Sequence, residues 1–222
     1  MCIIAVCRTR NLSKEEIITA WRTNSDGAGI AYGIGESTHI IKGIMKQSEL
    51  IEKYASIPLP HVVHFRTASS GTVCKELTHP FEITPNSKQL TSNTLCRYPV
   101  LFHNGTFTEW KSAWLSAVLN GMEIDGAMND SRFLAMICGT IYKRNPSRSM
   151  RQIITMLESL GGKYAIVQPD GNITTIGKFY EQSEPGVWLS AEPFFHTYNS
   201  HGTAYYDCNW AETRKNNNRL FL

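Results

Sequence analysis

Position two of the chain holds a residue that can act as a nucleophile, because Cys2 directly follows the initiator Met1. Once Met1 is removed, Cys2 carries a thiol and a free α-amine on the same residue. An α-amine has a pKa of roughly 7.7–8.0, so it can accept a proton near neutral pH. A nucleophile that uses an N-terminal amine as its base is an established catalytic arrangement. Many chains begin with Met-Cys, so the other residues must decide whether this chemistry applies.

Two charged residues are candidates for recognising a substrate with a charged head group. Arg66 directly follows an apolar segment, residues 61–65, and a buried guanidinium is costly unless its charge is paired. Its planar fork suits a carboxylate, which either a ligand or an aspartate of the chain itself would supply. Asp130 stands at the start of a predicted helix, where a carboxylate either caps the helix or faces a substrate ammonium group.

The dipeptide Asn104-Gly105 also has two interpretations. When a thiolate attacks an amide carbonyl, negative charge develops on the oxygen. An Asn side-chain amide and a Gly main-chain N–H, placed together, can form an oxyanion hole for that charge. Asn-Gly is equally the commonest dipeptide of tight hairpin turns, and this pattern alone favours the turn.

Two other polar segments are less specific. His79 lies next to Pro80, and this position alone favours a hydrogen-bonded turn residue. Residues 24–29 read Asn-Ser-Asp-Gly-Ala-Gly. Small residues of this kind permit a tight turn, or a close approach of the backbone to the nucleophile.

Hydrophobic periodicity and turn signals predict the elements that must position these residues. Strands are predicted at residues 1–7, 28–34, 38–44, 61–65, 99–103, 164–168, 173–176, 187–190 and 204–207. Helices are predicted at residues 13–22, 48–55, 108–119, 130–142 and 149–160, the first opened by a capping box of Ser13 and Glu16 and the third by Thr108 as N-cap. Hairpins at 28–44 and 164–176 imply antiparallel pairing. We therefore expect an α+β fold in one domain, residues 1–222.

Composition excludes several classes of function. The net charge of +3 is too small to indicate nucleic-acid binding, and the basic tail of Arg214, Lys215 and Arg219 is interpreted as a solvated terminus. No apolar run approaches the roughly 18 residues of a membrane span, and no secretory signal is visible. The six cysteines form no Cys-x-x-Cys pair, so we expect no zinc site and free thiols in a reducing cytoplasm.

Each motif is ambiguous alone, but their order is specific. Along the chain stand Cys2, Asp-Gly-x-Gly at 26–29, His-x-Arg-x-Ala-Ser-x-Gly at 64–71, His-Pro-Phe at 79–81, His-Asn-Gly at 103–105 and Asn-Asp-Ser at 129–131. This series resembles the class II glutamine amidotransferase domains, a branch of the N-terminal nucleophile hydrolases, and is closest to their stand-alone members. The resemblance continues more weakly through residues 161–165 and 190–193.

The resemblance implies a function and a set of site residues. Cys2 would attack the side-chain amide of glutamine with its own α-amine as base, and the γ-glutamyl thioester would be hydrolysed after ammonia leaves. Asn104 and Gly105 would form the oxyanion hole. The substrate-binding set is Arg66 for the α-carboxylate, Asp130 for the α-ammonium group, and Thr67 and His79 from the same motifs. No metal or cofactor is implied. The family fold is a four-layer αββα sandwich of two antiparallel sheets.

Three functions remain open at this point. The first is a glutamine amidohydrolase that supplies ammonia to a separate partner synthase. The second uses the same head-group site to hydrolyse γ-glutamyl peptides or conjugates. The third is a non-catalytic regulatory module, suggested by two departures from the family pattern. Ile3 replaces the usual Gly beside the nucleophile, and Arg132 replaces a Glu, so that its charge would neutralise Asp130.

Overall fold

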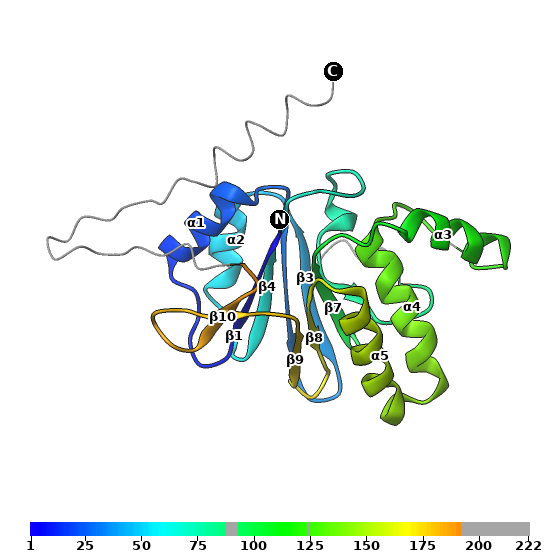
Figure 1. The fold of residues 1–222 in the computed structure, drawn as a ribbon. Coiled ribbons are helices and arrows are strands. Elements are labelled where there is room, and N and C mark those ends of the chain that lie inside the picture. The colour runs from blue at the N-terminus through cyan, green and yellow to red at the C-terminus, as the bar shows by residue number, and fades with distance from the viewer. Residues whose placement is uncertain (88–92, 124, 192–222) are drawn as a thin grey trace, which may run out of the picture. The chain divides into compact units, whose positions relative to one another are not determined.

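The computed structural model describes residues 1–87, 93–123 and 125–191 (Figure 1). The strands are β1 (Ile3–Cys7), β2 (Ala28–Gly33), β3 (Thr38–Ile44), β4 (His61–Phe65), β5 (Phe81–Glu82), β6 (Thr94–Cys96), β7 (Val100–Asn104), β8 (Lys163–Val167), β9 (Ile173–Ile176), β10 (Tyr180–Glu181) and β11 (Val187–Leu189). The helices are α1 (Lys14–Thr23), α2 (Gln47–Tyr54), α3 (Trp110–Leu119), α4 (Asp130–Arg144) and α5 (Pro146–Leu160), with a 3₁₀ turn, η1 (Lys75–Leu77).

The described strands form two antiparallel sheets. One has the order β10-β11-β1-β4-β2-β3-β6 and the other the order β5-β7-β8-β9. Every neighbouring pair in both sheets is antiparallel. The two predicted hairpins are confirmed as the pairs β2–β3 and β8–β9. The predicted α+β class with antiparallel sheets is therefore confirmed.

The alternation of side chains along β1 gives its two faces different neighbours. Ile4 and Val6 pack with Phe102 of the second sheet in one buried apolar cluster, so this face is turned to the other sheet. Cys7 lies on the opposite face, where its thiol meets the hydroxyl of Tyr54 in α2 at 3.3 Å. Figure 1 shows α1 and α2 beside this sheet. An apolar core thus fills the space between the two sheets.

Helices α4 and α5 pack against the four-stranded sheet. Leu134 of α4 and Leu157 of α5 share a buried cluster with Leu101 of β7 and Ile166 of β8. Asn145 separates the two helices, and α5 begins at Pro146, three residues before the predicted start. Proline suits the first turn of a helix because its missing N–H would have no helical partner there.

Several elements differ from the sequence-based prediction. Strands β5, β6 and β10 and the turn η1 were not predicted, because two or three residues are too few to display a period. Helix α3 begins at Trp110, two residues late; the prediction of Thr108 as N-cap is wrong, since Glu109 occupies that position. The predicted strand at 204–207, the motif residues 192–193, Cys208 and the basic tail lie outside the described residues.

Helix α3 contributes no buried residue to the core. Leu115 and Leu119 are exposed, and Figure 1 shows the helix extending away from α4. None of the helices in the described ranges is both long enough and apolar enough to cross a membrane.

Candidate active site

Strand alternation brings the predicted site residues to one end of the layer between the sheets. Cys2 stands two residues before Ile4, on the face of β1 that is turned to the second sheet. Asn104 stands two residues after Phe102, on the face of β7 that is turned to the first sheet. Arg66 stands two residues after His64, whose ring donates to the carbonyl of His103 across the same layer at 3.3 Å.

The Cys2 thiol is partly buried and held by one main-chain unit. It donates to the carbonyl oxygen of Thr67 at 3.3 Å, and the Thr67 N–H donates to the sulfur at 3.4 Å. Burial raises the pKa of the Cys2 thiol; the Thr67 N–H and the charge of Arg66 act in the opposite direction, and Asp130 adds to the rise. The thiol therefore needs a proton acceptor to become a nucleophile at neutral pH.

The side chain of Thr67 points away from the thiol. Its hydroxyl donates to the Asn24 side-chain oxygen at 2.6 Å and lies 3.3 Å from the carbonyl of Thr23, where α1 ends. Asn24 is itself buried and serves as the C-cap of that helix. Thr67 thus contacts the reacting sulfur through its main chain, and its hydroxyl links that main chain to the end of α1 by hydrogen bonds.

Arg66 is 2% exposed and has no acidic partner among the described residues. Its guanidinium donates to the carbonyls of Thr72 at 3.0 Å and Ser70 at 3.2 Å. The alternative of an internal Arg–Asp ion pair is therefore wrong. Burial lowers the pKa of Arg66, yet an arginine stays charged in proteins. The group keeps its positive charge and has N–H donors to spare, although Asp26 and Asp130 act on it from beyond ion-pair distance.

Asp130 is the first residue of α4 and is 3% exposed. The N-cap is Asn129, whose side chain accepts the N–H of Arg132 at 2.8 Å, so the prediction of Asp130 as a simple cap is wrong. Asp130 instead accepts the N–H groups of Ser131 at 2.9 Å and Phe107 at 3.1 Å. No cation within the described ranges forms an ion pair with Asp130, and its carboxylate also accepts the hydroxyl of Ser131 at 3.4 Å.

Arg132 does not neutralise Asp130. Its Nε donates to the carbonyl of Ser87 at 2.9 Å and its Nη1 to that of Ala127 at 2.6 Å. Burial lowers its pKa, and the acid that opposes this effect is Asp125. Ile3 also leaves the site unobstructed, because it lies on the face of β1 opposite Cys2 and is fully buried there.

Asn104 and Gly105 do not form a hairpin turn. Asn104 is the last residue of β7 and is paired with Lys163 of β8. Its side-chain nitrogen is 2.8 Å from Ser190 Oγ, while its side-chain oxygen is buried without a hydrogen-bond partner. A Cβ on Gly105 would lie 2.8 Å from the ring of His103, so the chain has room only for glycine there.

The prediction of His79 as a hydrogen-bonded turn residue is wrong. The side chain is buried, and neither ring nitrogen has a hydrogen-bond partner. Its ring lies 3.9 Å from that of His64, centroid to centroid, and burial, followed by the field of His64, holds its pKa well below the usual value. A Cβ on Gly29 would come within 1.9 Å of the His79 carbonyl oxygen. The close approach expected near residues 24–29 is thus to His79 and not to the nucleophile.

Sequence reasoning missed the role of Ser190, which directly follows β11. Its N–H donates to the carbonyl of Ile4 at 2.9 Å, and its hydroxyl accepts the N–H of Ile4 at 2.8 Å. The only sequence signal was its place in the weak motif at 190–193. The contact joins residues 186 positions apart, and no local pattern reports such a pairing.

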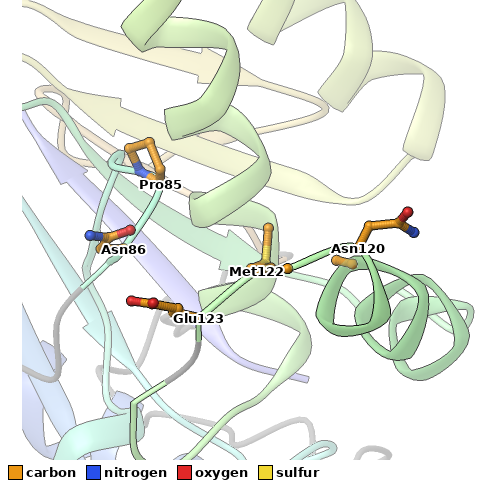
Figure 2. Close-up of a pocket in the computed structure, with 7 residues that line it drawn as sticks. Pro85, Asn86, Asn120, Met122 and Glu123 are labelled. Atoms are coloured by element: carbon orange, nitrogen blue, oxygen red, sulfur yellow. The ribbon is translucent and has the colours of Figure 1, made fainter.

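A separate cavity of about 480 Å³ lies away from these residues (Figure 2). It is formed by Pro85, Asn86, Ala117, Asn120, Gly121, Met122 and Glu123. It thus lies between the segment after β5 and the end of α3. None of the predicted site residues lines it.

Comparison with known proteins supports the fold. No protein-family model matches the chain, and no curated protein matches it by sequence. Among solved structures, the chain is similar to glutamine phosphoribosylpyrophosphate amidotransferase from B. subtilis, solved with ADP and GMP, with a TM-score of 0.51 and 15% identity. The match covers 86% of this chain and 42% of that one, so the chain spans less than half of that relative. At this identity the likeness shows a shared fold.

Proposed function

We propose that this chain hydrolyses the side-chain amide of glutamine to glutamate and ammonia, with Cys2 as the nucleophile after Met1 is removed. One observation carries the proposal. The partly buried thiol of Cys2 is hydrogen-bonded to the main chain of Thr67, the residue that directly follows the buried Arg66. The charges of Arg66 and of the buried Asp130 both act on the pKa of this thiol. Neither of these charged groups has an ion-pair partner in the described part of the chain.

The two unpaired charges favour a zwitterionic ligand. A buried charge without a partner costs several kcal/mol or more, depending on how far water and main-chain dipoles compensate it. An amino-acid head group supplies the missing partners, with its α-carboxylate for Arg66 and its α-ammonium group for Asp130. The main-chain N–H groups that Asp130 accepts orient its carboxylate before a ligand binds.

The reaction then proceeds in two steps. The α-amine of Cys2 takes the thiol proton, the sulfur attacks the amide carbon, and the oxyanion is stabilised by the Asn104 amide and the Gly105 N–H. Collapse returns the proton to the leaving nitrogen, so ammonia departs and a γ-glutamyl thioester remains. Water, deprotonated by the same amine, attacks the thioester, and glutamate leaves as the thiol is regenerated. The raised pKa of the Cys2 thiol is consistent with this need for a base.

The two departures from the family pattern do not weigh against catalysis. Ile3 lies on the opposite face of β1 from Cys2, and the Arg132 guanidinium is bound to carbonyls. We also propose the four-layer αββα arrangement for the whole fold, and a separate synthase as the acceptor of the ammonia. The neighbouring amidotransferase supports both by its fold and its name.

The test is intact-mass analysis of the full chain before and after exposure to a diazoketone analogue of glutamine, combined with a glutamate-release assay. We expect loss of Met1, one covalent adduct at Cys2, and glutamate release that Cys2→Ala abolishes. Cys96→Ala is the matched control, because Cys96 is a buried thiol in β6 that the mechanism does not use. Activity retained in Cys2→Ala would disprove the mechanism. A panel of glutamine, glutathione and γ-glutamyl amines would identify the leaving group.

A further inference from the structure

Ser190 joins the nucleophile strand to the proposed oxyanion residue. It is fully buried, and its main-chain N–H and side-chain oxygen hold both polar main-chain groups of Ile4, two residues after Cys2. The same side-chain oxygen lies 2.8 Å from the amide nitrogen of Asn104 on the other sheet. The carbonyl of Ser190 accepts Lys163 Nζ at 2.5 Å. One residue therefore fixes the position of Asn104 relative to the strand that carries the thiol.

The hydrogen-bonding capacity of these groups leaves one atom without a partner. A serine hydroxyl has one hydrogen to donate and two lone pairs. The Ile4 N–H occupies one lone pair, and with the Asn104 nitrogen on the other, the hydroxyl hydrogen is unused. At the same time the Asn104 oxygen is buried without a donor. Leaving a buried acceptor without a donor is destabilising.

Rotation of the Asn104 amide by 180° removes this conflict, because it exchanges the oxygen and nitrogen without moving another side chain. It gives up only the long contact of the amide nitrogen with the Ser190 carbonyl, at 3.5 Å, and that carbonyl still accepts Lys163 Nζ. The Ser190 hydroxyl then donates to the amide oxygen. The NH₂ group takes the place of the unpartnered oxygen, at the end of β7. An acceptor in that place would repel an oxyanion, whereas a donor would bind one.

We propose that Ser190 is a positioning residue, whose hydroxyl donates to the Asn104 side-chain oxygen and thereby directs the amide N–H to the oxyanion of the reaction. This inference rests on the proposed function. It assigns to Ser190 no contact with the substrate. We expect Ser190 to affect kcat and not KM, because the residues proposed to bind the head group, Arg66 and Asp130, do not contact Ser190.

The test is a double-mutant cycle of Ser190→Ala and Asn104→Ala in the full chain, measured as kcat and KM for glutamine. Removal of one oxyanion donor typically lowers kcat by about 10²–10³. We expect that loss for Asn104→Ala, a loss of roughly 10-fold or more for Ser190→Ala with KM nearly unchanged, and no further loss in the double variant. Ser190→Thr keeps the hydroxyl and should restore most of kcat.

Two controls separate positioning from general damage to the fold. Ser149→Ala removes another buried hydroxyl, which donates to the carbonyl of Ile141 in α4, and should act additively with Asn104→Ala. Alkylation of Cys2 by iodoacetamide needs no oxyanion hole, so Ser190→Ala should react at the wild-type rate if it is folded.

An altered alkylation rate, additive losses in the cycle, or a rise in KM alone would overturn the inference. A wild-type chain without glutaminase activity would refute the proposed function, and this inference with it, whereas an active chain with unchanged kcat in Ser190→Ala would refute the inference alone.

Discussion

The sulfur of Cys2 lies between the two polar main-chain groups of Thr67, 3.3 Å from its carbonyl oxygen and 3.4 Å from its amide nitrogen. The thiol can donate to the first group, and a thiolate can accept only from the second. Both ionisation states thus have a partner in the same place. Because the Thr67 hydroxyl is bound to Asn24, this main-chain unit is fixed before any substrate arrives.

The alkylation rate of Cys2 should therefore rise with pH, and burial should shift the midpoint of that rise to a higher pH. Burial raises the thiol pKa, so the thiolate fraction at neutral pH is smaller than for a thiol in water. In a chain that retains Met1, the rate of alkylation by iodoacetamide should rise with pH, with a midpoint above the ordinary value of about 8.5. Mass spectrometry of the Cys2 peptide measures this rate. A midpoint below the ordinary value would show that Arg66 and the Thr67 N–H outweigh burial.

Arg66 and Asp130 should recognise opposite ends of one head group. Loss of a hydrogen bond to a charged group costs about 1.5–3 kcal/mol, which corresponds to roughly 10- to 150-fold in kcat/KM. We expect Arg66→Gln and Asp130→Asn to lose this much, mainly through KM, whereas Arg151→Gln on the exposed part of α5 should lose nothing.

A comparison of substrates makes this assignment specific. Glutaramate keeps the carboxylate of glutamine and lacks the ammonium group. If Asp130 binds the ammonium group, wild-type protein should prefer glutamine to glutaramate strongly, and Asp130→Asn should lose most of that preference. Arg66→Gln should keep it. Equal loss of preference in both variants would contradict the pairing of one charge with one end.

Local signals in the sequence were sufficient for the elements that hold these residues. The capping box forms as predicted, with Ser13 Oγ accepting the Glu16 N–H at 3.1 Å and the Glu16 carboxylate accepting the Ser13 N–H at 2.7 Å. Strand β4 has the predicted bounds, because turn residues flank a short apolar run. Alternation then places Arg66 and Cys2 on the inner faces of neighbouring strands.

Contacts between distant segments could not be predicted in this way. The environment of His79 depends on the ring of His64 and on the backbone of Gly29, neither of which the His-Pro dipeptide reports. The pairing of β11 with β1, which sets the position of Ser190, depends on sheet order. The bond between Asn104 and Ser190 crosses from one sheet to the other. Such contacts follow from tertiary packing, and a single sequence carries little signal of it.

Buried neutral histidines should make the fold sensitive to mild acid. Burial lowers the pKa of His61 and of His103 to about 4, and that of His64 to about 3. Below about pH 6.5 the unfolded chain binds protons at these rings that the folded chain does not, so stability must fall as pH falls. Each ring contributes a slope of up to about 1.4 kcal/mol per pH unit between pH 6.5 and its folded pKa.

Urea unfolding at pH 7, 6 and 5 measures this dependence. His61→Gln removes one of the titrating groups, so its stability should fall less steeply than that of the wild type. A free energy of unfolding that stays constant or increases from pH 6.5 to 5 would contradict the neutral state of these rings.

Gly29 should tolerate no side chain, because β2 passes directly against the His79 carbonyl. A Cβ at this position would lie 1.9 Å from that oxygen and 3.1 Å from the carbonyl oxygen of Ile41, and both obstructing atoms belong to the backbone. Overpacking against rigid neighbours typically costs about 1–3 kcal/mol, and we expect the loss in Gly29→Ala to lie at or above the upper end of this range.

Gly35→Ala is the matched control, since Gly35 has a positive φ of 94° and a Cβ there would have no atom within 4 Å. Its backbone strain should cost about 1–2 kcal/mol. Thermal and urea unfolding of the two variants decide the point: equal losses would mean that the contact between Gly29 and His79 relaxes easily and does not hold the two segments in place.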